Sequence, residues 1–187
     1  MAGGEGSPNP LDDGLGVFRH CHAGILEHID RLRRLPVALA ARGARDALAD
    51  LSREAGEIAD FFRREVYEHH QQEEGVLFAE MRRAAPRAGE TALVDALCNR
   101  LTQEHRGIEE AWERIEPSIR RLAEGWRVEL DEDEVNALAV AYAAHAQFEE
   151  AVVLPMSTRL LSDGDKAALG LQLHLRHLRE GWRGYYV

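Results

Sequence analysis

Several features that mark particular protein classes are scarce in this sequence of 187 residues. It has only two cysteines, Cys21 and Cys98, too few for a disulfide framework in a domain of this size. Aromatic residues make up 6% of the chain. No apolar run approaches the roughly 18 residues that a membrane-spanning helix needs. These absences argue against a disulfide-stabilised secreted domain and a membrane-spanning protein, and we expect the chain to work in the reducing cytoplasm.

Positive charge is also scarce. The chain has 23 lysines and arginines against 33 aspartates and glutamates, a net charge of −10 with histidine neutral. Nucleic acid and anionic membrane surfaces both favour a basic protein face, so we expect neither of them as a partner. The first ten residues are rich in glycine and proline and lack a basic region followed by an apolar one. We therefore expect no signal peptide there.

The length suits one domain, since domains usually contain roughly 100–200 residues. Residues 1–16 show no hydrophobic period, and we expect them to form a disordered N-terminal arm. Residues 17–161 follow a helical period almost throughout, and there is no convincing run of alternating β-branched residues. Residues 162–187 are expected to form a short C-terminal helix and tail. The fold class predicted is therefore all-α.

Four long apolar stripes, each spaced by alternating threes and fours, indicate four long helices. They run from Phe18 to Leu39, from about residue 45 to residue 84, from Leu97 to Leu122, and from Leu138 to Met156. The connections between them are short. Long helices with short connections pack as antiparallel neighbours, so the sequence predicts an up-down-up-down four-helix bundle.

Prolines and acidic residues predict where these helices end. We expect Pro86 to stop the second helix, Pro117 to kink or divide the third, and Pro155 to distort the last turns of the fourth. The acidic residues 131–134 suit the positive N-terminal end of the fourth helix. A fifth helix over residues 165–179 is predicted, with Asp163 or Asp165 as its N-cap.

Ionisable residues interrupt every apolar stripe. Burying such a group without a partner costs several kcal/mol, so their presence needs a reason. The interrupting set consists of His22, His69 with Glu73, His105, and His145 with Glu149. A spacing of four places a histidine and a glutamate one above the other on one helix face. Such a pair is able to bind one metal ion or to reach two neighbouring ions.

An internal repeat supports this choice of residues. The segments HHQQEEGVLF (69–78) and HAQFEEAVVL (145–154) align without a gap, and pair His69 with His145 and Glu73 with Glu149. We interpret the neighbouring Glu74 and Glu150 as solvated helix charges. His70 lies one residue off the main stripe and is able to reach a metal as an extra ligand, because both registers of this helix are sterically reasonable.

The remaining histidines lie off the stripes or in the fifth helix. We interpret His20, His28, His174 and His177 as surface or packing residues.

The inward donor set of four imidazoles and two carboxylates suits iron, manganese or zinc. Two carboxylates neutralise only half the charge of two divalent ions, so a bridging hydroxide or oxide is expected. Six protein ligands are few for two octahedral ions. The open coordination positions are where a small molecule such as dioxygen would bind.

Taken in order, the ligand-bearing segments resemble a known family. CHAGILEHIDRL (21–32), HHQQEEGVLF (69–78), EHRGIEEAW (104–112) and HAQFEEAVVLP (145–155) are similar to the four ligand-bearing helices of hemerythrin-like (HHE cation-binding) domains. The resemblance covers residues 17–161. It implies a non-haem di-iron centre, oxo- or hydroxo-bridged, with zinc or manganese as other possible metals. It also implies a protein that carries, stores or senses dioxygen, buffers iron, or responds to nitric oxide or peroxide.

Carried over position by position, the resemblance assigns metal-ligand positions to His22, His69, Glu73, His105 and His145. Glu149 matches the carboxylate of the fourth helix, at a spacing of four where oxygen-carrying members usually have aspartate at five. Oxygen carriers also have a His-x-x-x-His on the third helix, and here the first position is Leu101. The missing imidazole argues against simple reversible oxygen carriage, and His70 is the residue that could compensate.

Three functions follow as hypotheses. The first is a di-iron protein that binds or senses dioxygen, or a related diatomic or peroxide ligand, or that buffers iron. The second is a di-iron enzyme of peroxidase or catalase type, although no dedicated acid–base residue beyond the ligands is evident. The third is a metal-free helical bundle that acts through a partner surface. A ferritin-like site is disfavoured because it uses Glu-x-x-His, the reverse of the order found here.

Overall fold

The computed structural model describes residues 15–41 and 47–179, and these residues form helices joined by short turns, with no strand among them. In chain order the elements are α1 (Gly16–Ala40), α2 (Leu48–Phe61), η1 (Phe62–Val66), α3 (Tyr67–Gln72), η2 (Glu73–Leu77), α4 (Phe78–Ala88), α5 (Thr91–Ala123), α6 (Glu132–Phe148), η3 (Glu149–Val153), α7 (Leu154–Leu160) and α8 (Asp163–Arg179). The elements marked η are single turns of π-helix. None of the described helices is long and apolar enough to cross a membrane.

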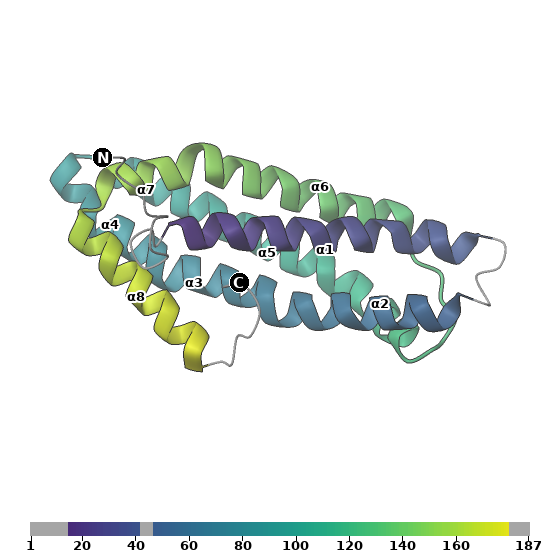
Figure 1. Cartoon of the computed structure of the whole chain (residues 1–187). Helices are drawn as coiled ribbons and strands as arrows, with labels where there is room; N and C mark the ends of the chain where they lie inside the picture. The colour runs from purple at the N-terminus through teal and green to yellow at the C-terminus, as the bar shows by residue number, and fades with distance from the viewer. Residues whose placement is uncertain (1–14, 42–46, 180–187) are drawn as a thin grey trace, which may run out of the picture.

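The described elements make four long rods. The first is α1, the second runs without a break from α2 through α4, the third is α5, and the fourth runs from α6 through α7. The first rod packs against the second and fourth, and the third packs against the same two, so the four rods surround one shared interior (Figure 1). This arrangement confirms the predicted four-helix bundle. The predicted arm lies outside the described residues up to position 14, as do the connection at 42–46 and the tail from 180 onward.

The fifth helix, α8, lies at the end of the bundle where α4 and α7 are found (Figure 1). Arg83 of α4 donates a hydrogen bond of 2.6 Å to Asp165 of α8. The N-cap predicted for this helix was wrong. Ser162 precedes the helix, and its hydroxyl accepts from the Asp165 N–H (3.2 Å) while the Asp165 carboxylate accepts from the Ser162 N–H (3.1 Å). This reciprocal capping box satisfies two backbone donors, which a single aspartate cap does not.

The prediction for Pro86 also needs correction, and one of the two alternatives predicted for Pro117 is excluded. Pro86 does not stop the second rod, which continues to Ala88 and ends at Gly89. Gly89 has a φ of 72°, a left-handed conformation that glycine adopts without steric cost, and the following Glu90 N–H bonds back to the Ala85 carbonyl. Pro117 does not divide α5. A proline removes only one backbone donor, and the buried residues on either side, Ile115 and Ile119, hold the helix in the core.

The fourth rod begins as its acidic residues predicted. The Asp131 carboxylate accepts hydrogen bonds from the N–H groups of Asp133 (2.9 Å) and Glu134 (3.2 Å). An N-cap of this kind satisfies donors that have no partner within the helix.

The apolar core is divided into two clusters along the bundle. Along α5, Leu101 belongs to one cluster and Ile108 to the other, and His105 lies between them. Along α1 the same order is Phe18, His22 and Ile25. The bundle therefore carries a buried polar layer with apolar packing on both sides, and this layer contains the ionisable residues that interrupted the stripes.

Candidate metal centre

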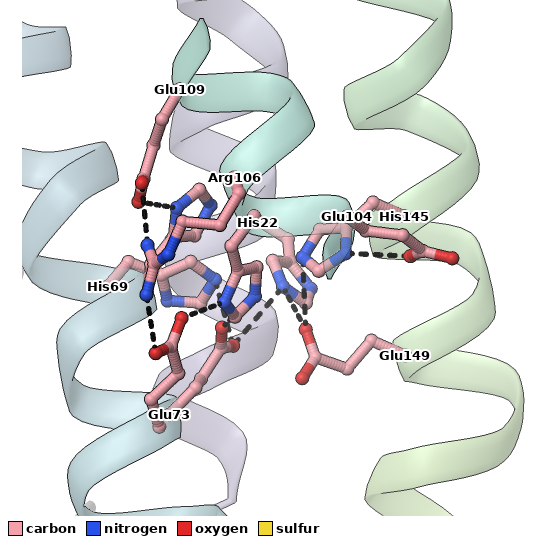
Figure 2. A network of polar contacts seen from close by, with 11 residues as sticks. His22, His69, Glu73, Glu104, Arg106, Glu109, His145 and Glu149 are labelled. Carbon is pink, nitrogen blue, oxygen red and sulfur yellow. Dashed lines mark hydrogen bonds and ion pairs between the residues drawn. The ribbon is translucent and has the colours of Figure 1, made fainter. Parts of the chain in front are cut away.

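Seven ionisable side chains form the polar layer, and each is at most 3% exposed. They are His22, His69, His70, Glu73, His105, His145 and Glu149. They come from all four rods and converge on the bundle axis, as Figure 2 shows for those it labels. All seven were predicted from the sequence as site residues, and the structure brings all seven together.

Two of the π-turns occupy equivalent places in the internal repeat. η2 begins at Glu73, and η3 begins at Glu149. A π-turn holds one more residue than an α-turn, so it changes which side chains face inward, and such turns are frequent at functional sites. The short helix α3 lies between η1 and η2, and it buries both His69 and His70. The sequence left the register of this segment open, and the structure places both imidazoles inside.

The possible ligand atoms fall into two groups, within each of which they lie no more than 4.8 Å apart. The three-histidine group consists of His70, His105 and His145. The mixed group consists of His22, His69, Glu73 and Glu149. His70 therefore lies with two histidines of other rods, while Leu101 lies in an apolar cluster.

Both carboxylates of the mixed group also reach the three-histidine group. Glu73 Oε1 is 3.0 Å from Nε2 of His69 in the mixed group, and its Oε2 is 3.2 Å from Nε2 of His105 in the three-histidine group. Glu149 Oε2 is 3.1 Å from Nε2 of His22 and 3.7 Å from Nε2 of His145. Each carboxylate thus contacts one histidine of each group, which is the position of a bridging ligand.

Most of these inward atoms have no hydrogen-bond partner, although they are fully buried. They are both oxygens of Glu73, Oε1 of Glu149, and Nε2 of His69, His70, His105 and His145. A buried polar atom without a partner costs about 1–3 kcal/mol, and here several face one another. A cation placed among them would satisfy these lone pairs together, so the residues present fit a bound metal.

The outward nitrogen is satisfied in four of the five imidazoles of the layer, whereas Nδ1 of His69 is buried without a hydrogen-bond partner. Nδ1 of His22 bonds Glu150 (3.0 Å), Nδ1 of His70 bonds Glu109 (2.9 Å), Nδ1 of His105 bonds Glu74 (2.8 Å), and Nδ1 of His145 bonds Glu104 (3.1 Å). A carboxylate accepts only, so each of these Nδ1 atoms carries a proton, which leaves Nε2 of neutral His70, His105 and His145 free of one. His22 differs, because its Nε2 also bonds a carboxylate, that of Glu149 (3.1 Å). Metal-binding histidines almost always have such a partner on the other nitrogen.

The family comparison agrees with this geometry. The model of the hemerythrin HHE cation binding domain matches residues 13–157. The chain belongs to this family. Comparisons with curated proteins and with solved structures found no match. The predicted resemblance is therefore confirmed, and the buried histidine and glutamate groups of this HHE domain are consistent with a bound cation.

Burial keeps most imidazoles of this HHE domain neutral. Desolvation lowers the pKa of His70 to about 3, lowers the pKa of His69 well below its usual value, and lowers the pKa of His105 and His145. Neutral imidazole is the form that binds a metal ion. These side chains are therefore already in the charge state in which imidazole acts as a ligand.

In two other groups of the layer, Glu73 and His22, the pKa is raised. Burial and the nearby charge of Glu149 raise the pKa of Glu73 well above its usual value. Burial alone would lower the pKa of His22, but the carboxylates of Glu149 and Glu73 outweigh it, and the pKa of His22 is raised. For Glu149, the bond from His22 outweighs burial, and its pKa is lowered. A proton on His22 thus adds positive charge, and a proton on Glu73 removes negative charge, at the position where a cation would bind.

The outer carboxylates change one interpretation and add residues that the sequence did not reveal. Glu74 and Glu150 were interpreted as solvated charges; the Glu150 side chain is 44% exposed, but each of the two also bonds an imidazole of a neighbouring rod. Their signal was the repeated Glu-Glu doublet. Glu104 and Glu109 were missed, and no period in the sequence distinguishes them from other helix-surface acids.

The histidines left out of the predicted site lie away from the polar layer where the structure describes them. His20 is exposed, and His28 stacks on Phe61 with ring centroids 3.6 Å apart. These positions agree with surface and packing roles. His174 and His177 belong to α8, but their side chains lie outside the described residues.

Proposed function

We propose that this HHE domain holds two iron ions, one at the three-histidine group and one at the mixed group, and uses them to bind or sense dioxygen or a related small molecule. The observation that carries the proposal is the convergence of unpartnered, buried Nε2 and carboxylate atoms from three rods, beside which His22 of the first rod completes the mixed group. Imidazole and carboxylate donors suit iron, and manganese and zinc are the other metals that such a set accepts. Iron, when bound, would supply the redox chemistry that the side chains lack.

The donor count leaves room for a small molecule. Three imidazoles and both carboxylates face one position, and two imidazoles and both carboxylates face the other. An octahedral ion would therefore keep open positions in both places. The two apolar clusters on either side of the layer exclude water from its surroundings. A small apolar molecule such as dioxygen suits an approach through this packing better than a charged substrate does.

We also propose that the protein works in a reducing compartment, as expected from its free thiols Cys21 and Cys98. The structure describes neither as part of a ligand group. Iron buffering is a variant of the same proposal, in which the two ions are cargo. Retention of iron against a competing chelator distinguishes a resident centre from a store.

The first test is metal content per chain in protein purified without added chelator and in protein loaded anaerobically with Fe²⁺. About two irons per chain are expected, and the loaded protein should change its visible spectrum on exposure to dioxygen. The His145→Ala variant should lose stoichiometric iron, whereas the exposed His20→Ala variant should keep it. One zinc per chain would contradict the redox proposal, and no metal even after loading would leave a metal-free bundle.

Peroxide turnover at the same centre is a second candidate, favoured by Tyr142. Its hydroxyl is buried without a hydrogen-bond partner, and its ring centroid is 5.8 Å from that of His145. A phenol so placed is able to donate a hydrogen bond to a small molecule beside the ligands. Peroxide consumption that is lost in Tyr142→Phe at unchanged iron content would favour the enzyme. Dioxygen binding without peroxide consumption would favour the sensor.

A further inference from the structure

A single guanidinium joins two of the outer carboxylates. Arg106 Nη2 donates to Glu74 Oε2 (2.7 Å), and Nη1 donates to Glu109 Oε2 (2.6 Å). The other oxygen of each carboxylate bonds an imidazole: Glu74 Oε1 bonds His105, and Glu109 Oε1 bonds His70. Figure 2 shows Arg106 beside Glu109 at the edge of the layer. Two relays, each from an imidazole through a carboxylate, therefore end on one arginine.

The two imidazoles at the inner ends of these relays are a matched pair. The rings of His70 and His105 are stacked, with centroids 4.0 Å apart and planes 6° from parallel. They come from different rods, and both belong to the three-histidine group. Both Nδ1 atoms bond carboxylates that Arg106 holds, so the two bonds lie on the same side of the stacked pair. The planar fork of a guanidinium matches two carboxylates in this arrangement, and the single ammonium of lysine does not.

His145, the third imidazole of the three-histidine group, has the same pattern of contacts. His145 Nδ1 bonds Glu104 Oε2, and Arg100 donates to the other oxygen of Glu104 at 2.7 Å. Every imidazole of the three-histidine group is therefore backed by a carboxylate that an arginine holds. This repetition points to a role for the arginines beyond ordinary surface ion pairing.

We propose that Arg106 is a positioning residue of the metal centre: by holding Glu74 and Glu109, it fixes the rings of His105 and His70 with hydrogen on Nδ1 and Nε2 directed inward. The inference rests on the proposed function, because the inward nitrogens are useful only to a bound ion. His70 depends most on this support, since it lies one residue off the apolar stripe of its rod. Without Arg106, both carboxylates are able to turn toward water, and the two rings lose their outer restraint.

The test compares Arg106→Gln with Arg120→Gln. Arg120 lies on the same helix, its side chain is 49% exposed against 51% for Arg106, and it pairs with Glu116 instead of a carboxylate that bonds an imidazole. Affinity for Fe²⁺, measured by anaerobic equilibrium dialysis on the full chain, should fall about tenfold or more in Arg106→Gln, the loss typical of an outer-shell partner. It should be unchanged in Arg120→Gln. Equal losses of Fe²⁺ affinity in both variants would overturn the proposal, because the loss would then come from removing any positive charge from this helix.

A second measurement establishes whether Arg106 acts through the carboxylates. In a Glu74→Gln/Glu109→Gln background, adding Arg106→Gln should cause no further loss of Fe²⁺ affinity, whereas independent effects would add. An additional loss of the same size would overturn the proposed relay.

A third readout needs no metal and separates this proposal from the proposed function. The ¹⁵N spectra of the imidazoles in the metal-free chain should show hydrogen on Nδ1 for His70 and His105. Arg106→Gln should give mixed tautomers for these two and leave His145 unchanged. Unaltered tautomers and Fe²⁺ affinity would overturn the positioning role and leave the metal site intact. Altered tautomers in a chain that binds no Fe²⁺ would support the positioning and reject the metal function.

Discussion

Glu74 and His105 form a bond of 2.8 Å across two rods, on the side of the imidazole opposite to Glu73, whose Oε2 lies 3.2 Å from the other ring nitrogen. Two consecutive glutamates thus hold one histidine at both nitrogens. The second copy of the repeat does the same, since His22 lies between Glu149 and Glu150. In each pair of consecutive glutamates, the first carboxylate therefore faces the metal position and the second orients a histidine.

The outer member of each doublet should contribute to metal affinity without touching the metal. Glu74→Gln and Glu150→Gln are each expected to weaken Fe²⁺ binding about 10–100-fold, because the imidazole loses the carboxylate that fixes its tautomer. Glu110→Gln, an exposed glutamate on α5, is the control. Anaerobic equilibrium dialysis measures the affinities. Wild-type affinity in both doublet variants would mean that these bonds are only surface interactions.

His70 should be the third imidazole of its group, in place of a histidine that α5 lacks. His70→Ala is expected to reduce the iron content from about two ions per chain to about one. Leu101 lies four residues before His105, so a histidine there would share its helix face. The double variant His70→Ala/Leu101→His should recover part of the lost iron. Iron content measured with protein concentration tests both, and full occupancy in His70→Ala would exclude His70 as a ligand.

Metal loading should stabilise the folded chain. A metal that binds only the folded state adds RT ln(1 + [L]/Kd), about 2.7 kcal/mol at a hundredfold excess over Kd. For a chain of this size, 1 kcal/mol shifts Tm by about 2–4 °C. Calorimetry of loaded and chelator-treated protein should therefore differ by about 5–11 °C. An identical Tm would support the hypothesis of a metal-free bundle.

The metal-free chain should become less stable as pH rises above neutrality. The pKa of His22 is raised by its carboxylate neighbours against the effect of burial, and that of Glu73 is raised by burial and by Glu149. The four imidazoles with a lowered pKa act in the opposite direction only near the unfolded histidine pKa of about 6.5. Well above that pH they are neutral in both states, and His22 and Glu73 then make the folded state bind more protons than the unfolded state. Stability from His22 is complete below its unfolded pKa and is lost as pH passes its folded pKa, and the ionisation of Glu73 acts in the same direction.

Metal loading should remove this dependence, because the ion takes the place of both protons. Denaturation midpoints from about pH 7.5 to about pH 9, with and without Fe²⁺ under anaerobic conditions, measure the difference. A second readout is proton release, expected to be about two per loaded chain in weakly buffered solution, since metal ligands must be deprotonated. Parallel pH profiles for the loaded and metal-free chains would contradict this linkage.

The predictions that succeeded depended on local periodicity. His22, His105 and His145 interrupt apolar stripes at core positions, and all three are buried in one layer. The apolar stripe of the fourth helix selected Glu149, and the repeat extended that choice to Glu73. These are the two carboxylates that contact histidines of both groups. The predictions that failed concerned backbone ends. Gly89 and Ser162 end and begin helices through bonds to residues several positions away, which the proline and aspartate rules do not capture.

The sequence by itself determined the four-helix bundle and the inward set of histidines and glutamates, because a helical period specifies which residues share a face. Only the tertiary structure decided that His70 joins His105 and His145, since its placement depends on the π-turns that flank α3. It also decided that Glu74, Glu104, Glu109 and Glu150 orient the imidazoles. Those bonds cross between rods, and their formation depends on the rotation and axial offset of one helix against another, which no local pattern records.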